Sequence, residues 1–164
     1  MQMMNKELII TLINLLDMKN IELTRVVCEC LYYFSFDSNI LQFIYQNGFK
    51  KLKDLLEEVN DPSIFCSIIN ILTEFIRKNE NLSNDLILNM IKFLKNTEDL
   101  FYLSRIFKSL NELTKIDQTI KLFKQENIYP NLIFHLENQI NNPDIQLNIL
   151  SILQQCGKDK QSAE

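Results

Sequence analysis

Leu12-Ile13-Asn14-Leu15-Leu16 is a short, mostly apolar stretch whose pattern recurs three times along the chain. Its counterparts begin at residues 52, 90 and 132, so the spacings are 40, 38 and 42 residues. They are Leu52-Lys53-Asp54-Leu55-Leu56, Met90-Ile91-Lys92-Phe93-Leu94 and Leu132-Ile133-Phe134-His135-Leu136. Recurrence at a fixed period of roughly 20 to 50 residues is typical of proteins built from stacked structural repeats.

A second series of apolar markers keeps the same period. Leu31-Tyr32-Tyr33-Phe34 is followed by similar tetrapeptides that begin at residues 72, 110 and 150, which gives spacings of 41, 38 and 40 residues. Two independent markers with one period predict four repeats, with approximate limits of 1–37, 38–78, 79–116 and 117–157. We therefore expect a single domain over residues 1–157 and a polar tail at 158–164.

The apolar residues between the markers follow the period of an α-helix. Spacings of three and four residues form one broad apolar stripe along Ile64, Ile68, Ile69, Leu72, Phe75 and Ile76. No segment alternates apolar and polar residues over the length of a strand, and 2 glycines in 164 residues are too few for the turns of a many-stranded sheet. The sequence therefore predicts an all-α fold.

Capping residues and turns divide the predicted helices. Asp61-Pro62 and Asn142-Pro143 predict helix starts, and Asn20 and Asp99 stand at the equivalent places with weaker signals. Short amphipathic helices are expected at 40–46, 82–87 and 119–125. The first is expected to end at Asn47-Gly48, where glycine adopts the left-handed conformation, and Asn127 is expected to replace glycine in the last repeat. A polar turn is expected at 157–159.

Charge and cysteine content exclude several classes of function. The net charge is −4 and the lysines are scattered, so we expect no nucleic-acid partner. The four cysteines lack the spacing of a disulfide framework or a metal site; Cys28, Cys66 and Cys156 are expected to fill the core. No stretch of 18 apolar residues is present, so we expect no membrane insertion. We predict a cytoplasmic protein, with the cytoskeleton or a cilium as the alternative.

One junction resembles a known repeat family. Ile44-Tyr45-Gln46-Asn47-Gly48-Phe49-Lys50-Lys51-Leu52-Lys53-Asp54-Leu55-Leu56 is similar to the armadillo repeat, with a short helix, an Asn-Gly turn and a second helix that ends in a leucine pair. Gln125-Glu126-Asn127-Ile128-Tyr129-Pro130-Asn131-Leu132 resembles the same junction. The resemblance covers roughly residues 5–156, as three full repeats and a partial first one. HEAT repeats, with two helices per unit, are the alternative.

The resemblance implies a right-handed α-α superhelix whose third helices line a groove that binds a peptide or another protein. In the nuclear-import adaptors and the catenins an asparagine ladder clamps the ligand, and in the import adaptors tryptophans flank it. The ladder positions here are Tyr33, Glu74, Glu112 and Ile152, and the tryptophan positions are Glu29, Asn70, Lys108 and Asn148. Every ladder position departs from the family pattern, so a receptor for nuclear-localisation signals is not expected.

The predicted groove surface is polar and mixed in charge. It consists of Arg25, Glu29, Tyr33, Asn70, Glu74, Arg77, Arg105, Lys108, Glu112 and Asn148, to which Lys115 adds a further positive charge. Tyr33 and Arg105 are of the residue types that often carry binding energy at interfaces. The alternative is that Glu74–Arg77 and Lys108–Glu112 are pairs within one helix on a solvated surface.

The sequence carries no recognised catalytic motif, and we predict no enzymatic activity and no cofactor. His135, the only histidine, is expected to be a partly buried helix residue. We expect a protein-binding scaffold, either a small adaptor or a subunit of a larger assembly. The alternatives are a structural component of a cytoskeletal or ciliary complex and a regulator of a chaperone or another enzyme.

The ends of the predicted repeat array are also candidate binding surfaces. The first repeat begins with apolar residues, and neither end has a polar cap of the kind that solenoids normally need. We therefore expect one or both ends to associate with a protein partner or another copy. The apolar residues at the first end are Met3, Met4, Leu8, Ile9 and Leu12.

Overall fold

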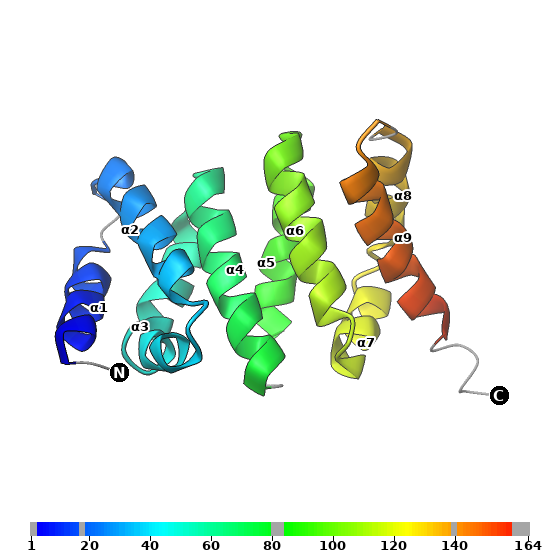
Figure 1. The fold of residues 1–164 in the computed structure, drawn as a ribbon. Coiled ribbons are helices and arrows are strands. Elements are labelled where there is room, and N and C mark those ends of the chain that lie inside the picture. The colour runs from blue at the N-terminus through cyan, green and yellow to red at the C-terminus, as the bar shows by residue number, and fades with distance from the viewer. Residues whose placement is uncertain (1–2, 17–18, 80–83, 139–140, 159–164) are drawn as a thin grey trace. The chain divides into compact units, whose positions relative to one another are not determined.

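The computed structural model describes residues 3–16, 19–79, 84–138 and 141–158, and every regular element in these ranges is an α-helix (Figure 1). This confirms the all-α fold class. The chain divides into two compact units, Met1–Lys78 and Asn79–Glu164. The division falls where the sequence predicts the boundary between the second and third repeats.

The first unit contains α1 (Met3–Leu15), α2 (Ile21–Phe34), α3 (Ser38–Glu58) and α4 (Pro62–Asn79). Helix α1 packs against both α2 and α3. Lys51 Nζ of α3 donates hydrogen bonds to the carbonyl oxygens of Ile13 (2.9 Å) and Asn14 (3.2 Å). A positive charge at the C-terminal end of a helix stabilises its unpaired carbonyl groups. Lys51 therefore fixes the end of α1 on α3.

The second unit contains α5 (Asn84–Leu94), α6 (Leu100–Leu113), α7 (Asp117–Gln125), α8 (Tyr129–Asn138) and α9 (Pro143–Lys158). Helices α6 and α9 lie side by side (Figure 1). Helix α5 packs against α6 and α7, and α8 packs against α9. The unit therefore pairs its two long helices, with α5 packed against the first of them and α8 against the second.

The predicted capping residues start the helices. Asp61 Oδ1 accepts a hydrogen bond from the backbone N–H of Ile64 at 3.0 Å, and Asn142 Oδ1 accepts one from Ile145 at 3.2 Å. Asn20 and Asp99, whose capping signals in the sequence are weaker, also cap helices: Asn20 caps α2 and Asp99 caps α6. These side chains satisfy N–H groups that have no partner within the helix.

The turn predicted at Asn47-Gly48 is wrong. Helix α3 continues through both residues, and Gly48 does not adopt a positive φ. Gly48 is buried, and a Cβ atom on it would lie 3.0 Å from Ile13 Cδ1 and 3.1 Å from Ile13 Cγ1. The glycine therefore allows α3 to approach α1 closely, and the short helix expected at 40–46 is the first part of α3.

The other predicted turns have mixed outcomes. Asn127 has a φ of 47° and separates α7 from α8, as the sequence predicts. The turn predicted at 157–159 does not begin at Gly157, because α9 continues to Lys158. Residues 159–164, which make up most of the expected tail, lie outside the described residues. The short helix expected at 82–87 lies partly outside them too, and from Asn84 onward its sequence belongs to α5.

The apolar residues expected on a binding surface at the start of the first repeat divide between two environments. Leu8 is exposed on α1, whereas Ile9 faces the interior and is buried, so its assignment to that surface is corrected. Leu12 is half-buried. The side chains of Met3 and Met4 lie outside the described residues.

Buried apolar side chains form the interior of each unit. Val27, Leu31, Ile44, Leu52, Ile64 and Ile68 belong to the first unit, and Leu103, Ile106, Phe107, Phe123, Leu132 and Ile149 to the second. Cys28, Cys66 and Cys156 are buried free thiols, as predicted, and Cys30 is half-buried. Burial raises the pKa of the Cys28 thiol to about 12, and the nearby carboxylates of Glu29 and Asp61 act in the same direction.

Candidate protein-binding surface

The predicted groove residues lie on four helices, two in each unit. Arg25, Glu29 and Tyr33 follow one another at intervals of four residues along α2, so they share one face of that helix. Asn70, Glu74 and Arg77 belong to α4, Arg105, Lys108 and Glu112 to α6, and Asn148 to α9.

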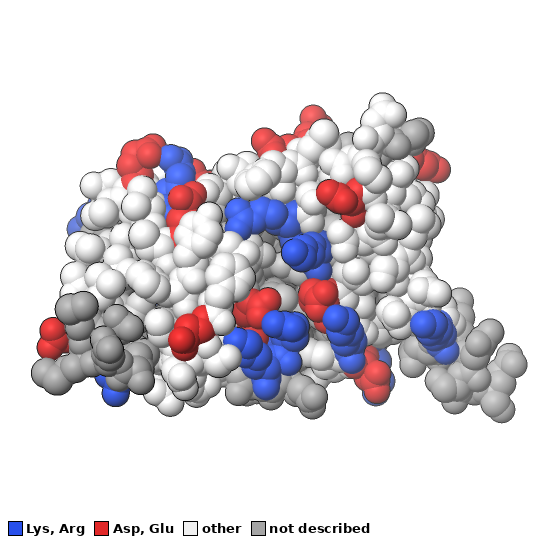
Figure 2. All heavy atoms as spheres, in the orientation of Figure 1, with Lys and Arg blue, Asp and Glu red and all other residues white. Residues whose placement is uncertain are grey.

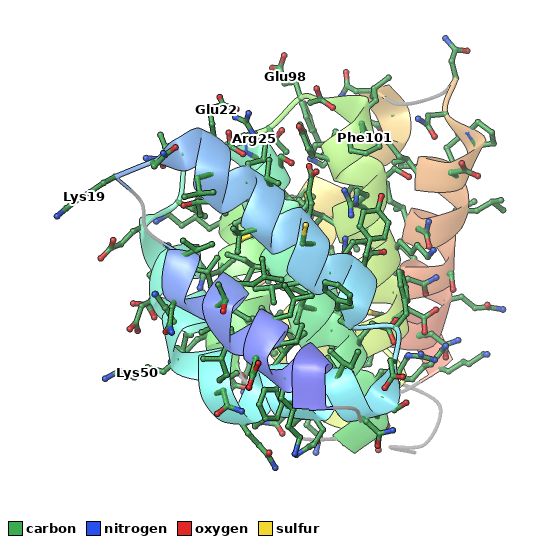
Figure 3. All side chains as sticks on the ribbon, turned by 60° about the vertical axis from the view of Figure 1, so that its left-hand side comes forward. Lys19, Glu22, Arg25, Lys50, Glu98 and Phe101 are labelled. Carbon is green, nitrogen blue, oxygen red and sulfur yellow. The ribbon has the colours of Figure 1, made fainter. Side chains whose placement is uncertain are left out.

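Arg25 connects α2 to the start of α4 in the first unit. Its guanidinium group donates to Asp61 Oδ2 and to Glu22 Oε2, both at 2.7 Å. Figure 3 labels Arg25 and Glu22 on α2. Partial burial opposes the ionisation of Asp61, but hydrogen bonds from Arg25 and from the backbone N–H of Ile64 outweigh it and lower the pKa of Asp61. Asp61 therefore caps α4 and binds Arg25 at the same time.

Glu29 forms a second connection between these two helices. Its Oε1 accepts a hydrogen bond from the Ser63 hydroxyl at 3.1 Å, one turn further along α2 than Arg25. Two of the three predicted α2 residues therefore have partners on α4 or in the turn before it. Tyr33, the third, lies beyond these connections and is 70% exposed.

Tyr33 belongs to an exposed aromatic cluster at the C-terminal end of α2. The Tyr32 ring lies 5.7 Å from the Tyr33 ring and 5.1 Å from the Phe36 ring, centroid to centroid. Phe36 is 59% exposed. Ser35 fixes the turn between them, because its backbone N–H and its hydroxyl both donate to the Tyr32 carbonyl. We call Tyr32, Tyr33 and Phe36 the α2 aromatic cluster.

The α2 aromatic cluster was only partly predictable from the sequence. Tyr33 was identified from its place on the helix, whereas Phe36 lies beyond the helix end and has no place in the repeat pattern. The nearby aspartate Asp37, which caps α3, was the available signal that Phe36 lies in a turn. A large apolar side chain in a fixed turn between two helices is commonly exposed.

The α4 residues form a local ion pair. Arg77 Nη2 donates to Glu74 Oε2 at 2.7 Å, three residues away on the same helix. This is the predicted intrahelical pair. Exposed pairs of this kind contribute less than about 1 kcal/mol to stability.

In the second unit, Asn148 is held by a hydrogen-bond network between α6 and α9. Asn111 Nδ2 donates to Asn148 Oδ1 at 3.0 Å, and the Ser151 hydroxyl donates to Asn111 Oδ1 at 2.8 Å. Asn148 Nδ2 donates to the Asp144 carbonyl. Asn148 is predicted from the sequence to belong to this surface, whereas Asn111, which is adjacent to the ladder position Glu112, is not. Ile152, the ladder position on α9, is fully buried.

The remaining α6 residues make local contacts. The Arg105 guanidinium lies 5.4 Å from the centre of the Phe101 ring, which is a cation–π geometry. Glu112 binds Lys115 at 2.6 Å, so the expected Lys108–Glu112 pair is corrected to Glu112–Lys115. Acidic and basic side chains are interspersed on the face shown in Figure 2, and neither sign dominates it.

His135 is more buried than expected. Its side chain is enclosed within the second unit, where Nε2 donates a hydrogen bond to the Leu94 carbonyl at 3.1 Å and the ring lies edge-on to Phe107 and Phe134. Burial lowers the pKa of His135, and the bond to Leu94 opposes this only in part. The imidazole is therefore neutral at physiological pH.

A recess of about 560 Å³ lies beside His135, between the end of α5 and α8. Its lining includes the side chains of Lys95, Glu98, Asn131 and Phe134. The repeat pattern does not predict it, because its two walls are about 40 residues apart along the chain. Among the described residues no group of three histidine, cysteine or acidic side chains is arranged to hold a metal ion. No described helix is long and apolar enough to cross a membrane.

Comparison with known proteins identifies the fold alone. No protein-family model and no curated protein matches the chain. Among solved structures, the chain is similar to an engineered protein whose crystal structure comes from the Northeast Structural Genomics Consortium, with a TM-score of 0.67 and 15% sequence identity. The similarity covers 90% of this chain and 62% of the engineered protein, so the chain spans less than two thirds of that protein's length.

Proposed function

We propose that this protein is a non-enzymatic scaffold that binds other proteins, built as an armadillo-like superhelix of four repeats. The observation that carries the proposal is the α2 aromatic cluster, in which Tyr33 and Phe36 are 70% and 59% exposed. Tyrosine is enriched among the residues that carry binding energy at protein interfaces. A fixed aromatic side chain also loses little conformational freedom on binding, because the Tyr33 and Phe36 rings already contact Tyr32.

Two further features support a binding role over catalysis. His135 is buried, and its Nε2 is already bound to a backbone carbonyl. Helix α2, which carries Tyr32 and Tyr33, is connected through Arg25 and Glu29 to Asp61 and Ser63 at the start of α4, so the cluster lies on a prearranged support. The four free thiols support a reducing compartment such as the cytoplasm.

The test compares partners captured by the wild-type chain and by a Tyr33→Ala/Phe36→Ala variant in cells of the native source. Quantitative mass spectrometry should show at least one stoichiometric protein partner for the wild type and about a tenfold or greater loss of it for the variant. Leu88→Ala removes an exposed apolar side chain from α5 and serves as the matched control, with unchanged capture expected. Equal capture by all three proteins would remove the cluster from the binding surface.

A further inference from the structure

The recess beside His135 is bounded by two segments of the second unit. One wall is the C-terminal end of α5 with the turn after it, from Leu94 to Glu98, and the other wall is one face of α8. Its volume of about 560 Å³ falls within the range of about 300–1,000 Å³ that is usual for ligand sites. The groove residues expected from the sequence do not line it, so the recess is a separate candidate site.

Helix α8 presents an amide, an aromatic ring and a second amide to the recess. Asn131, Phe134 and Asn138 line it at intervals of three and four residues, so they share one face of the helix. The Phe134 ring is 59% exposed and lies edge-on to the His135 ring, with 5.3 Å between the centroids. The two asparagines are seven residues apart, which is about 10 Å along a helix. Three residues of an extended chain span the same length.

Both amides retain hydrogen-bonding capacity for a ligand. Asn138 Nδ2 donates one hydrogen bond, to the Phe134 carbonyl at 2.7 Å, which leaves its side-chain oxygen and its second N–H group. The Asn131 side chain has no hydrogen-bond partner among the described residues. An asparagine side chain both donates and accepts, so it is complementary to the N–H and C=O groups of a peptide backbone.

The charged side chains on the opposite wall do not favour an ion as the ligand. Lys95 and Glu98 carry opposite charges, so together they give the recess no net charge. Both are exposed, and neither forms an ion pair with another described residue. Exposed charges are screened by water and salt and contribute little binding energy. A neutral ligand that is bound through hydrogen bonds and apolar contact therefore fits the recess better than an anion or a cation.

His135 is the buried member of the lining. Its side chain is 5% exposed, and its Nδ1 has no hydrogen-bond partner among the described residues. Because Nε2 donates to the Leu94 carbonyl, Nδ1 is an acceptor. Buried acceptors are nearly always paired in native proteins. The unpaired acceptor therefore favours a ligand that brings N–H groups, as a peptide backbone does.

We propose that this recess binds an extended peptide segment of another protein. Asn131 and Asn138 bond backbone groups of the segment that are three residues apart, and an apolar side chain between these groups packs on Phe134. The recess belongs to the second unit and the α2 aromatic cluster to the first. The failure of this proposal and that of the proposed function are therefore separable.

The test selects peptides from a phage-displayed library of random sequences on the full chain and measures the affinity of the synthetic peptides by fluorescence anisotropy. For at least one peptide, Asn131→Ala and Phe134→Ala should each weaken binding about tenfold or more. Two variants outside the lining are the matched controls. Asn96→Ala removes an exposed asparagine and Ile133→Ala an exposed apolar side chain of α8, and both should bind this peptide like the wild type.

Methylation of the peptide backbone tests how the segment is bound. One N-methyl group at a time removes one N–H donor from the peptide and leaves its side chains unchanged. Methylation should weaken binding most at two positions that are three residues apart, because Asn131 and Asn138 are spaced to bond such groups.

Three results would overturn the proposal. They are peptides whose affinity depends on Tyr33 and Phe36 but on neither Asn131 nor Phe134, N-methylated peptides that all bind like the parent, and a recess that binds members of a small-molecule fragment library but no peptide. The first of these would leave the proposed function intact. Circular dichroism checks that each variant is folded, and Asn138→Ala takes the place of Asn131→Ala if the latter is not.

Discussion

Replacing Gly48 by alanine tests the packing of α3 on α1. A methyl group at this position would lie 3.0 Å from Ile13 Cδ1 and 3.1 Å from Cγ1, closer than ordinary carbon contacts. Overpacking of a buried site costs about 1–3 kcal/mol. Alanine in place of glycine within a helix stabilises it by about 1 kcal/mol. Because the contact is short and Ile13 is itself buried, we expect Gly48→Ala to lower the free energy of unfolding by about 1 kcal/mol.

Two companion variants isolate the cause. Gly157 is also helical, but a methyl group there would meet nothing within 4 Å, so Gly157→Ala should be neutral or stabilising by up to about 1 kcal/mol. Ile13→Val removes Cδ1, the atom nearest to the added methyl group. The cost of Gly48→Ala should therefore be smaller in the Ile13→Val background than in the wild type.

Urea unfolding followed by circular dichroism gives the four free energies needed for this double-mutant cycle. Stabilisation by Gly48→Ala of the same size as that by Gly157→Ala would refute the close approach of α3 and α1. A cost that does not change when Ile13 is shortened would also refute it, and would favour the helix end that the sequence predicted at Asn47-Gly48.

Three further predictions concern the interior of the two units. The pKa of His135 is lowered in the folded state, so the unfolded chain takes up a proton first as the pH falls below about 6.5. Below this pH the free energy of unfolding should therefore decrease more steeply in the wild type than in His135→Leu. Equal pH dependence of the two proteins in chemical unfolding would contradict this. In the native protein Cys28 is buried and its pKa is raised, so it should react with a maleimide far more slowly than Cys30. Equal labelling of the two cysteines in peptide mass spectrometry would exclude the burial of Cys28. Asn111→Ala removes two hydrogen bonds to α9 and should lower the free energy of unfolding by about 2 kcal/mol. Asn138→Ala removes a hydrogen bond within one helix and should lower it less. Equal losses in urea unfolding would count against the hydrogen-bond network between α6 and α9.

Helix starts were predictable because their causes are local. Asp61 and Asn142 cap helices through atoms only three residues away, and Asn127 ends α7 through its own backbone conformation. The prediction of a turn at Gly48 was wrong because the role of this glycine is set by Ile13, 35 residues earlier in the chain. Glycine has a local preference for helix ends, but close packing of two helices overrides that preference here.

For the α2 residues of the candidate surface, the position on the helix was predictable but the separate roles were not. The spacing of four residues placed Arg25, Glu29 and Tyr33 on one face of α2, and the structure agrees. Their separate roles depend on Asp61 and Ser63, which lie 36 and 34 residues further along the chain. The sequence pattern alone therefore could not separate the two residues that connect helices from the tyrosine that is exposed.

We propose that the α2 aromatic cluster is the protein-binding site of a scaffold. Hydroxyl-radical footprinting of the chain, alone and in a complex isolated from its native source, tests it most directly, because aromatic rings are oxidised when exposed. We expect strong oxidation of Tyr33 and Phe36 in the isolated chain and protection of both in the complex. Equal oxidation of these two rings in both states, with protection elsewhere on the chain, would contradict it.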